Sequence, residues 1–346
     1  MVSNPLHSLI AENIERLINL DISGYGVVAE LNLSARHHYG GPLAWMAAEQ
    51  LRGALSGGGY FFVTSGWLMP GCYPYGETDG PIGAATLGRA LAMAFGARMV
   101  VLTEVEMVAC TTAACRAAGL NVLAEDDITR APRPPHPNVP MCIIVPVPIP
   151  LESAQAEAFR LFDIYEPKAI LSVEKNGPNA DGKYCMVDGE DNSDCVMKAA
   201  EFFYEATRRG VLTIGIGDRG NEIGFGAIAE IPRRLLPFGD QATDTTVVDV
   251  LVTACVSNWG ASGIVAALAT MLNRSDVMHD PETERRMLHR CMEAGGVDGF
   301  TCKPIPQTDG MREPAHIGVC ALLNEIVRAP AVKVPSVFAT PLYRLN

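Results

Sequence analysis

Short apolar runs alternate along the chain with segments of helical spacing, and this alternation limits the folds open to it. The runs are YFFVTS at 60–65, RMVVLTE at 98–104, MCIIVPV at 141–147, KAILSVE at 168–174, VLTIGIG at 211–217 and VVDVLVTACV at 247–256. Short, continuously apolar runs are typical of strands buried on both faces. Segments such as PIGAATLGRALAMAFG and NWGASGIVAALATML have the spacing of helices. The pattern predicts an α/β fold of the doubly wound type, with a mainly parallel β-sheet flanked by helices.

The whole chain, residues 1–346, is expected to form one α/β domain. Hydrophobic residues make up 48% of it, which is ample for a large core. The segment 1–56 has helical spacing and is predicted to pack on that domain as an N-terminal helical segment. The proline-rich APRPPHPNVP at 131–140 cannot extend a helix, so it predicts a surface connector, or a boundary between two lobes.

Charge and composition exclude several classes of partner. The formal net charge of −12 argues against nucleic acid, because phosphate backbones are bound by clustered Lys and Arg. No apolar run approaches the ~18 residues of a membrane span, and the N-terminus has no cationic start. Ten cysteines without a CxxC pair indicate reduced thiols and no disulfide. We therefore expect a cytoplasmic protein that has neither nucleic acid nor a membrane as its partner, and homo-oligomerisation stays open.

Polar, glycine-rich loops follow four of the apolar runs. They are GETDGP after 60–65, EKNGPNADGKY after 168–174, GDRGNEIG after 211–217 and SNWGASG after 247–256. Ligands of open parallel sheets bind at the carboxyl edge of the strands. The four loops are therefore predicted to converge on one site.

The loop GIGDRGNEIGFG at 215–226 satisfies the dinucleotide pattern G-x-G-x-x-G. Asp218 and Glu222 would, however, repel a pyrophosphate at that position, so we expect neither NAD nor flavin. Together with Asn221 and the earlier Glu77, these residues offer the oxygen ligands that Mg²⁺ or Mn²⁺ prefers, and zinc is not expected. The alternative is a tight turn in which Asp218 or Asn221 only caps the following helix.

The other loops supply candidates for substrate binding and proton transfer. Glu174 and Lys175 stand at a predicted strand end, where partial burial would shift their pKa values for proton transfer, although a surface ion pair is the alternative. With Asp218 they are the catalytic candidates. The predicted substrate-binding residues are Thr78, Asp79, Gly80, Arg219, Ser257 and Asn258. Helix capping is the structural alternative for Thr78, Asp79, Ser257 and Asn258.

Five motifs taken in order resemble the C-terminal domain of the D-glutamate cyclase family. They are GETDGPIGA, EKNGPNADGKY, GIGDRGNEIGFG, VSNWGASG and the late GGVDG followed by TDG, and the resemblance runs from about Phe61 to Glu325. The family's loop usually contains GDGGNEIG, so Arg219 here adds a cation beside the acids. The resemblance implies a carbon–oxygen lyase that forms 5-oxo-D-proline from D-glutamate, or that acts on a related acidic metabolite.

That cyclisation needs a base for the substrate ammonium, a positive group near the reacting carboxylate and an acid for the departing oxygen. Glu174 is predicted to act as base or acid, while Asp218 and Glu222 hold a divalent ion. Lys175 or Arg219 would fix the substrate carboxylates. Two alternatives remain: a metal-dependent hydrolase or phosphatase of small molecules, and a non-catalytic metabolite-binding protein.

Overall fold

The computed structural model describes residues 5–130 and 139–329. Most of the predicted proline-rich connector, residues 131–138, lies outside the described residues. The strands are β1 (Tyr60–Ser65), β2 (Arg98–Thr103), β3 (Asn121–Val122), β4 (Met141–Pro146), β5 (Ala169–Val173), β6 (Leu212–Gly217), β7 (Val250–Thr253), β8 (Gln307–Thr308) and β9 (Met311–Arg312). Each predicted run thus contains a strand. β7 is shorter than its run, and β3 was not predicted because two residues carry no periodic signal.

The helices before and between the first strands are α1 (Pro5–Ile18), α2 (Val28–Tyr39), α3 (Leu43–Leu55), α4 (Pro81–Phe95), η1 (Val105–Met107), α5 (Val108–Ala117), α6 (Glu125–Arg130) and α7 (Leu151–Tyr165). The later ones are α8 (Ala200–Arg209), η2 (Phe225–Ile228), α9 (Glu230–Leu235), α10 (Gly239–Ala242), α11 (Ser257–Leu272), η3 (Ser275–Val277), α12 (Pro281–Glu293) and α13 (Glu313–Arg328). Proline at the first position of α4, as the sequence predicts, suits a helix start because its missing N–H has no helical partner there.

Seven parallel strands form the main sheet in the order β3-β4-β2-β1-β5-β6-β7. From β1 the chain passes to β2, then to β3 at the edge and back to β4 between β3 and β2, and it then crosses to the other side of β1 for β5, β6 and β7. The order in which strands are added therefore reverses between β1 and β5, although all the strands are parallel. This confirms the predicted doubly wound α/β fold. Ligands of such sheets bind outside the carboxyl ends of the strands at this switch point.

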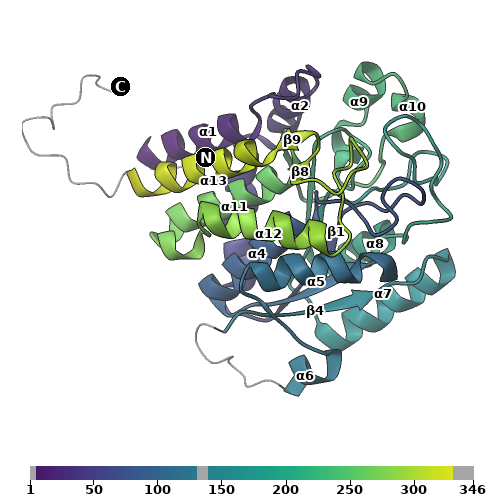
Figure 1. Cartoon of the computed structure of the whole chain (residues 1–346), viewed down its shortest axis with the longest axis horizontal. Coiled ribbons are helices and arrows are strands. Elements are labelled where there is room, and N and C mark those ends of the chain that lie inside the picture. The colour runs from purple at the N-terminus through teal and green to yellow at the C-terminus, as the bar shows by residue number, and fades with distance from the viewer. Residues whose placement is uncertain (1–4, 131–138, 330–346) are drawn as a thin grey trace, which may run out of the picture.

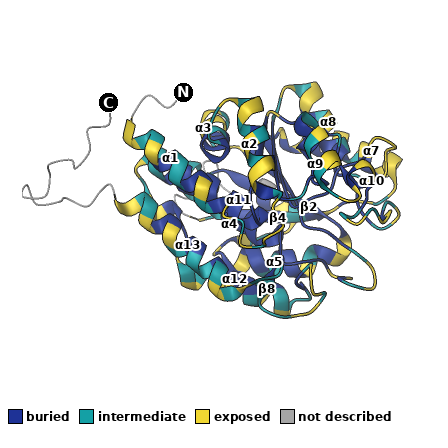
Figure 2. Ribbon diagram, turned by 90° about the horizontal axis from the view of Figure 1, so that it is seen from above, coloured by how far each residue is buried: buried dark blue, intermediate teal, exposed yellow. Residues whose placement is uncertain are grey.

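Helices cover both faces of the sheet. Phe62 of β1 contacts Phe162 of α7 with ring centroids 5.1 Å apart. Val173 of β5 is in register with Ser65, so its side chain points to the face opposite Phe62. There it lies against Gly83 of α4, where an added Cβ would come within 2.8 Å of it. α7 and α4 therefore lie on opposite faces. Figure 2 shows α4 and α11 as almost wholly buried helices beneath an outer layer.

The N-terminal helices pack on the same side as α11. Ile14 and Ile18 of α1 are buried, and Gly263 of α11 leaves room for the Ile18 side chain. The Ile18 carbonyl also accepts a hydrogen bond from the Cys255 backbone N–H, which leads into α11. α1 lies beside α13, so the two ends of the described chain meet (Figure 1). Among the described residues, no helix has the length and apolar character required to cross a bilayer.

Candidate functional site

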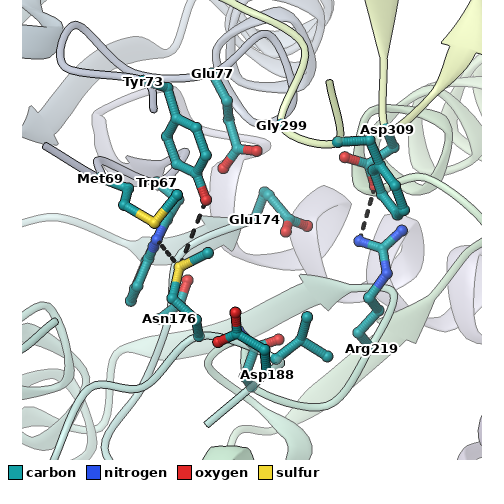
Figure 3. Close-up of a pocket in the computed structure, with 14 residues that line it drawn as sticks. Trp67, Met69, Tyr73, Glu77, Glu174, Asn176, Asp188, Arg219, Gly299 and Asp309 are labelled. Carbon is teal, nitrogen blue, oxygen red and sulfur yellow. Dashed lines mark hydrogen bonds and ion pairs between the residues drawn. The ribbon is translucent and has the colours of Figure 1, made fainter. Parts of the chain in front are cut away.

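A cavity of about 270 Å³ opens at the switch point of the sheet. The loop after β1 contributes Trp67, Met69, Tyr73 and Glu77; the loop after β5 contributes Glu174, Asn176, Met186, Val187 and Asp188; the loop after β6 contributes Arg219 and Asn221; and the C-terminal region contributes Gly299, Phe300 and Asp309. Figure 3 shows these side chains converging from their different loops. The loops after β1, β5 and β6 meet at one pocket, while the residues that follow β7 lie beneath it.

Six buried acidic side chains gather at the pocket and directly under it. This carboxylate cluster consists of Glu77, Asp79, Glu174, Asp218, Glu222 and Asp309, whose exposed fractions run from 0% for Glu222 to 7% for Glu174. Arg219 is the only basic residue among the pocket-lining residues, all of which belong to the described chain. Six buried carboxylates cannot all stay charged beside a single guanidinium. The cluster must therefore take up protons or a further cation.

Asp218 is the centre of the carboxylate cluster. Asp218 belongs to two groups of three carboxylates. In the first, oxygens of Asp218, Asp79 and Asp309 lie within 4.8 Å of one another, and in the second the same is true of oxygens of Asp218, Glu174 and Glu222. Neither Asp218 oxygen accepts a hydrogen bond, although the Arg219 guanidinium lies 3.0 Å from Oδ1. A buried carboxylate with unfilled acceptor positions and other hard oxygens around it fits a divalent cation such as Mg²⁺ or Mn²⁺.

Burial raises the pKa of four members of the cluster well above the usual range. For Glu77 and Asp79 the loss of solvation is reinforced by the nearby charge of Asp309. For Glu174 the added repulsion comes mainly from Glu222. Burial also raises the pKa of Asp218, and the Arg219 guanidinium only partly offsets it. Carboxyl groups with raised pKa values can hold and release a proton near neutral pH, which general acid–base catalysis requires.

Glu222 occupies the backbone amides of its own loop. Its Oε1 accepts hydrogen bonds from the N–H groups of Asp218 and Arg219, and its Oε2 accepts one from Gly220 at 2.7 Å. These amides are the ones that a phosphate would need in a dinucleotide-binding loop. The loop therefore holds an internal carboxylate where such a loop would hold a phosphate. Asn221, the neighbouring candidate, lines the pocket and donates to the Cys185 carbonyl.

Asp79 and Asn258 cap each other's helix. The Asp79 carboxylate accepts hydrogen bonds from the backbone N–H groups of Ser257 and Asn258 at the start of α11. The Asn258 side-chain oxygen in turn accepts from Gly80 and Gly83 at the start of α4, at 3.0 and 2.6 Å. Because Asn258 fills these amides, the start of α4 is not free to bind a substrate carboxylate. Capping therefore accounts for the contacts of both side chains, and the assignment of Asp79 and Asn258 to substrate binding stays a prediction.

Thr78 and Gly80 shape the same loop. The Thr78 hydroxyl donates to the Gln307 carbonyl and accepts a hydrogen bond from the Thr308 hydroxyl, which holds the β8–β9 hairpin against the site. Gly80 has a φ of 92°, and a Cβ there would come within 2.3 Å of the Gly66 backbone nitrogen. Only glycine fits that position. Both residues position the pocket but do not line it, and their assignment to substrate binding stays a prediction.

Glu174 directly follows the C-terminal end of β5 and has a strained backbone conformation. Its φ of 57° is in the left-handed region that glycine favours, which is unusual for a larger residue. Ser257 donates a 2.5 Å hydrogen bond to Glu174 Oε2. This backbone conformation and the hydrogen bond from Ser257 direct the carboxyl group toward the pocket, where Glu174 is one of the lining residues. Ser257 thus orients Glu174 from below.

Lys175 is directed away from the pocket. Its ammonium lies 2.6 Å from both oxygens of Glu104, and neither side chain is exposed to solvent. Glu104 also accepts the Met197 backbone N–H at 2.9 Å. Lys175 is absent from the pocket lining, so its place in the structure is a buried ion pair joining the ends of β2 and β5. Its assignment as a catalytic residue gains no support from this geometry.

Arg219 reaches from the β6 loop to the C-terminal hairpin. Its guanidinium contacts Asp309 at 3.1 Å and lies over the Phe300 ring, 4.5 Å from the ring centre. Although burial opposes its charge, Asp218 and Asp309 raise the pKa of Arg219, so it remains a cation. Asp309 itself has a φ of 53° and precedes Gly310 in a hairpin turn. The TDG sequence predicts such a turn. It does not indicate that the Asp309 carboxylate enters the site.

The fold and the pocket define an α/β protein with a pocket of buried carboxylates at the switch point of a doubly wound sheet. The chain belongs to the family described as D-glutamate cyclase-like, C-terminal, whose model matches residues 14–324. It is also 32% identical to the human protein "D-glutamate cyclase, mitochondrial" over 121 residues, which is 34% of this chain and 20% of that protein. The chain thus aligns with about a fifth of the length of the curated relative it matches.

Proposed function

We propose that this protein is a D-glutamate cyclase-type carbon–oxygen lyase, which closes D-glutamate into 5-oxo-D-proline with loss of water or acts on a related small acidic metabolite. The observation that carries the proposal is the Asp218-centred carboxylate cluster, buried beside a cavity of about 270 Å³ at the switch point. Family membership supports a cyclase-type reaction, and the human relative is a D-glutamate cyclase by name.

The reaction conserves protons. The substrate amine must become neutral and attack its own γ-carboxyl carbon, so that a C–N bond forms and a C–O bond breaks. The ammonium gives up two protons on its way to the ring amide, and the departing oxygen needs two protons to leave as water. One carboxyl group that can both accept and donate a proton therefore suffices. Glu174 fits this role because burial raises its pKa and Ser257 fixes one of its oxygens.

Asp218, with Asp79 and Asp309 or with Glu174 and Glu222, would hold a divalent ion, Mg²⁺ or Mn²⁺. When bound, such an ion would supply positive charge for the reacting carboxylate. Glu77 and Asn221 lie at the pocket wall and would complete the set of oxygen ligands. Arg219, the basic residue of the lining, would pair with a substrate carboxylate. We place this reaction in the cytoplasm, consistent with ten free thiols, with no nucleic acid or membrane as partner.

The direct test is incubation of the purified chain with D-glutamate, L-glutamate and a generic phosphoester, each with Mn²⁺, Mg²⁺ or EDTA. Mass spectrometry should show loss of one water from glutamate and no phosphoester cleavage. Phosphoester cleavage instead would favour the metal-dependent hydrolase, and binding of glutamate without product would favour a non-catalytic binding protein.

Glu174→Gln supplies the matched loss of function, because it keeps the size of the side chain and removes the carboxyl proton. Turnover should fall about 10²- to 10⁴-fold. The control is Glu190→Gln, an exposed glutamate in the same β5–α8 loop, which should keep wild-type activity. Equal activity of the two variants would contradict the role given to Glu174.

A further inference from the structure

One wall of the pocket holds two hydrogen-bond donors that share a weak acceptor. The indole N–H of Trp67 and the hydroxyl of Tyr73 both donate to the thioether sulfur of Met186, with donor–sulfur distances of 2.6 and 3.5 Å. Trp67 and Tyr73 are each only 3% exposed, and all three residues line the pocket. Figure 3 draws these two hydrogen bonds as dashed lines from Trp67 and Tyr73.

A thioether is a poor partner for such donors. Its sulfur accepts hydrogen bonds only weakly, whereas a carboxylate oxygen accepts them strongly. Buried indole and phenol groups normally find a proper acceptor. Met186 also has a long, unbranched side chain that can change rotamer at little cost. A ligand oxygen could therefore replace the sulfur with a gain in hydrogen bonding.

Tyr73 keeps its proton in this setting. Burial raises the pKa of its hydroxyl above the ordinary value, and the nearby charge of Glu77 adds to the effect. The hydroxyl is therefore a donor to any anionic oxygen that enters. The Trp67 indole N–H can only donate. The wall thus offers two fixed donors.

The opposite wall supplies the complementary charge. Figure 3 shows Arg219 and Asp309 facing Trp67 and Tyr73 across the pocket, with Glu77 and Glu174 between the two walls. A substrate with two carboxylates and an ammonium on the carbon chain between them fits this order: one carboxylate at Arg219, the other at the donor pair, and the ammonium beside Glu77 and Glu174.

We propose that Trp67 and Tyr73 form a carboxylate-binding subsite in which Met186 serves as a displaceable acceptor while the pocket is empty. The assignment rests on the proposed function for the identity of the substrate, D-glutamate, but the subsite itself requires only a carboxylate ligand. The role of Met186 is then to keep two buried donors partly satisfied until the ligand arrives.

The test measures binding of D-glutamate and of glutarate, a dicarboxylate without the ammonium, by isothermal titration calorimetry. Trp67→Phe and Tyr73→Phe each remove one donor and keep an aromatic ring. Each should raise the Kd for both probes about 10- to 100-fold, because a hydrogen bond to a charged group is lost. For D-glutamate turnover, KM should rise more than kcat falls. Tyr204→Phe, a tyrosine 46% exposed on α8, is the matched control and should bind like the wild type.

Met186→Leu separates the subsite from a merely structural contact. It removes the sulfur and keeps most of the volume, so the empty pocket loses its acceptor while the filled pocket is unaffected. Both probes should then bind as tightly as to the wild type, or more tightly. If Trp67 and Tyr73 served only to anchor the Met186 loop, all three variants would weaken binding alike, and the proposal would be overturned.

The remaining outcomes are also decisive. Unchanged Kd values in both Phe variants, or no binding of either probe by the wild type, would overturn the subsite. Binding that depends on Trp67 and Tyr73 without any formation of 5-oxoproline would refute the proposed reaction and leave the subsite standing. If Trp67→Phe does not fold, as judged by thermal unfolding, Tyr73→Phe carries the same comparison.

Discussion

Replacing Lys175 with methionine separates a structural role from a catalytic one. In the structure the Lys175 ammonium neutralises Glu104, and neither side chain reaches solvent. In Lys175→Met the Glu104 carboxylate keeps the Met197 N–H as a close donor and a longer contact of 3.4 Å with the Thr103 hydroxyl. Breaking one partner of a buried pair typically costs about 3–5 kcal/mol, because a buried charge is left uncompensated. The ratio of folded to unfolded protein should therefore fall about 100- to 5,000-fold.

Urea unfolding followed by tryptophan fluorescence measures this cost. Lys175→Met combined with Glu104→Gln should recover most of the lost stability, since the pair is then uncharged and the Gln oxygen can still accept the Met197 N–H. Activity toward D-glutamate, assayed under conditions where each variant is folded, should stay within about tenfold of wild type, because only a group in the proton path contributes the 10²- to 10⁴-fold expected of an acid or base.

The opposite result would refute this reasoning. If Lys175→Met unfolds at the wild-type urea concentration while its turnover is lost, the ion pair contributes nothing to stability and Lys175 takes part in the chemistry. A double variant that is less stable than Lys175→Met alone would likewise show that charge compensation is not the reason for the pairing.

Three further predictions follow from the same geometry. Asp218→Asn should abolish turnover and the rise in melting temperature caused by Mn²⁺ while the protein stays folded; an undiminished metal response would contradict the role of Asp218. Asn258→Ala leaves the buried Gly83 N–H without its side-chain acceptor, while the Gly80 N–H keeps Asp79 Oδ1 at 3.0 Å, and should cost about 1–3 kcal/mol in urea unfolding; a cost near zero would show that the cap is dispensable. Burial raises the pKa of Asp244 to about 8, above roughly 3.9 in an unfolded chain. The folded state then binds the Asp244 proton more tightly than the unfolded chain does. The protonated carboxyl group therefore adds to the free energy of unfolding below about pH 4, and this contribution is lost as the pH rises to about 8. Melting temperatures across this range should fall with pH, and Asp244→Asn should flatten the curve; an unchanged slope would contradict the assignment.

The sheet and the place of the site could be predicted from the sequence, because a strand buried on both faces requires a continuous apolar run. The strand ends then locate the polar loops without further information. Glu174 and Lys175 show where this reasoning stops. They are neighbours in sequence, but the left-handed φ of Glu174 and the distant Glu104 direct one side chain into the pocket and the other into a buried ion pair. Neither the backbone conformation nor the partner is encoded locally.

Other members of the site were missed for the same physical reason. Trp67 and Tyr73 lie in an irregular loop without periodicity, and their shared partner Met186 is more than a hundred residues away. Asp309 carries a visible hairpin signal, but a turn signal does not say which way the turn faces. Glu222 was predicted as a metal ligand from its charge, whereas the structure shows that it first satisfies the amides of its own loop.

The reciprocal caps of α4 and α11 have a consequence for folding during synthesis. Their hydrogen bonds join residues separated by 175 to 180 positions, so the β1–α4 loop leaves the ribosome long before its partner has been made. Contacts between such distant parts of a chain form late, after the intervening segments have collapsed. A nascent chain that ends before Ser257 can build its first strands but cannot fix the turn at Asp79 and Gly80. The pocket would therefore become competent only after Ser257 and Asn258 have been made, and a shorter chain would carry most of the acidic cluster without the means to bring its members together.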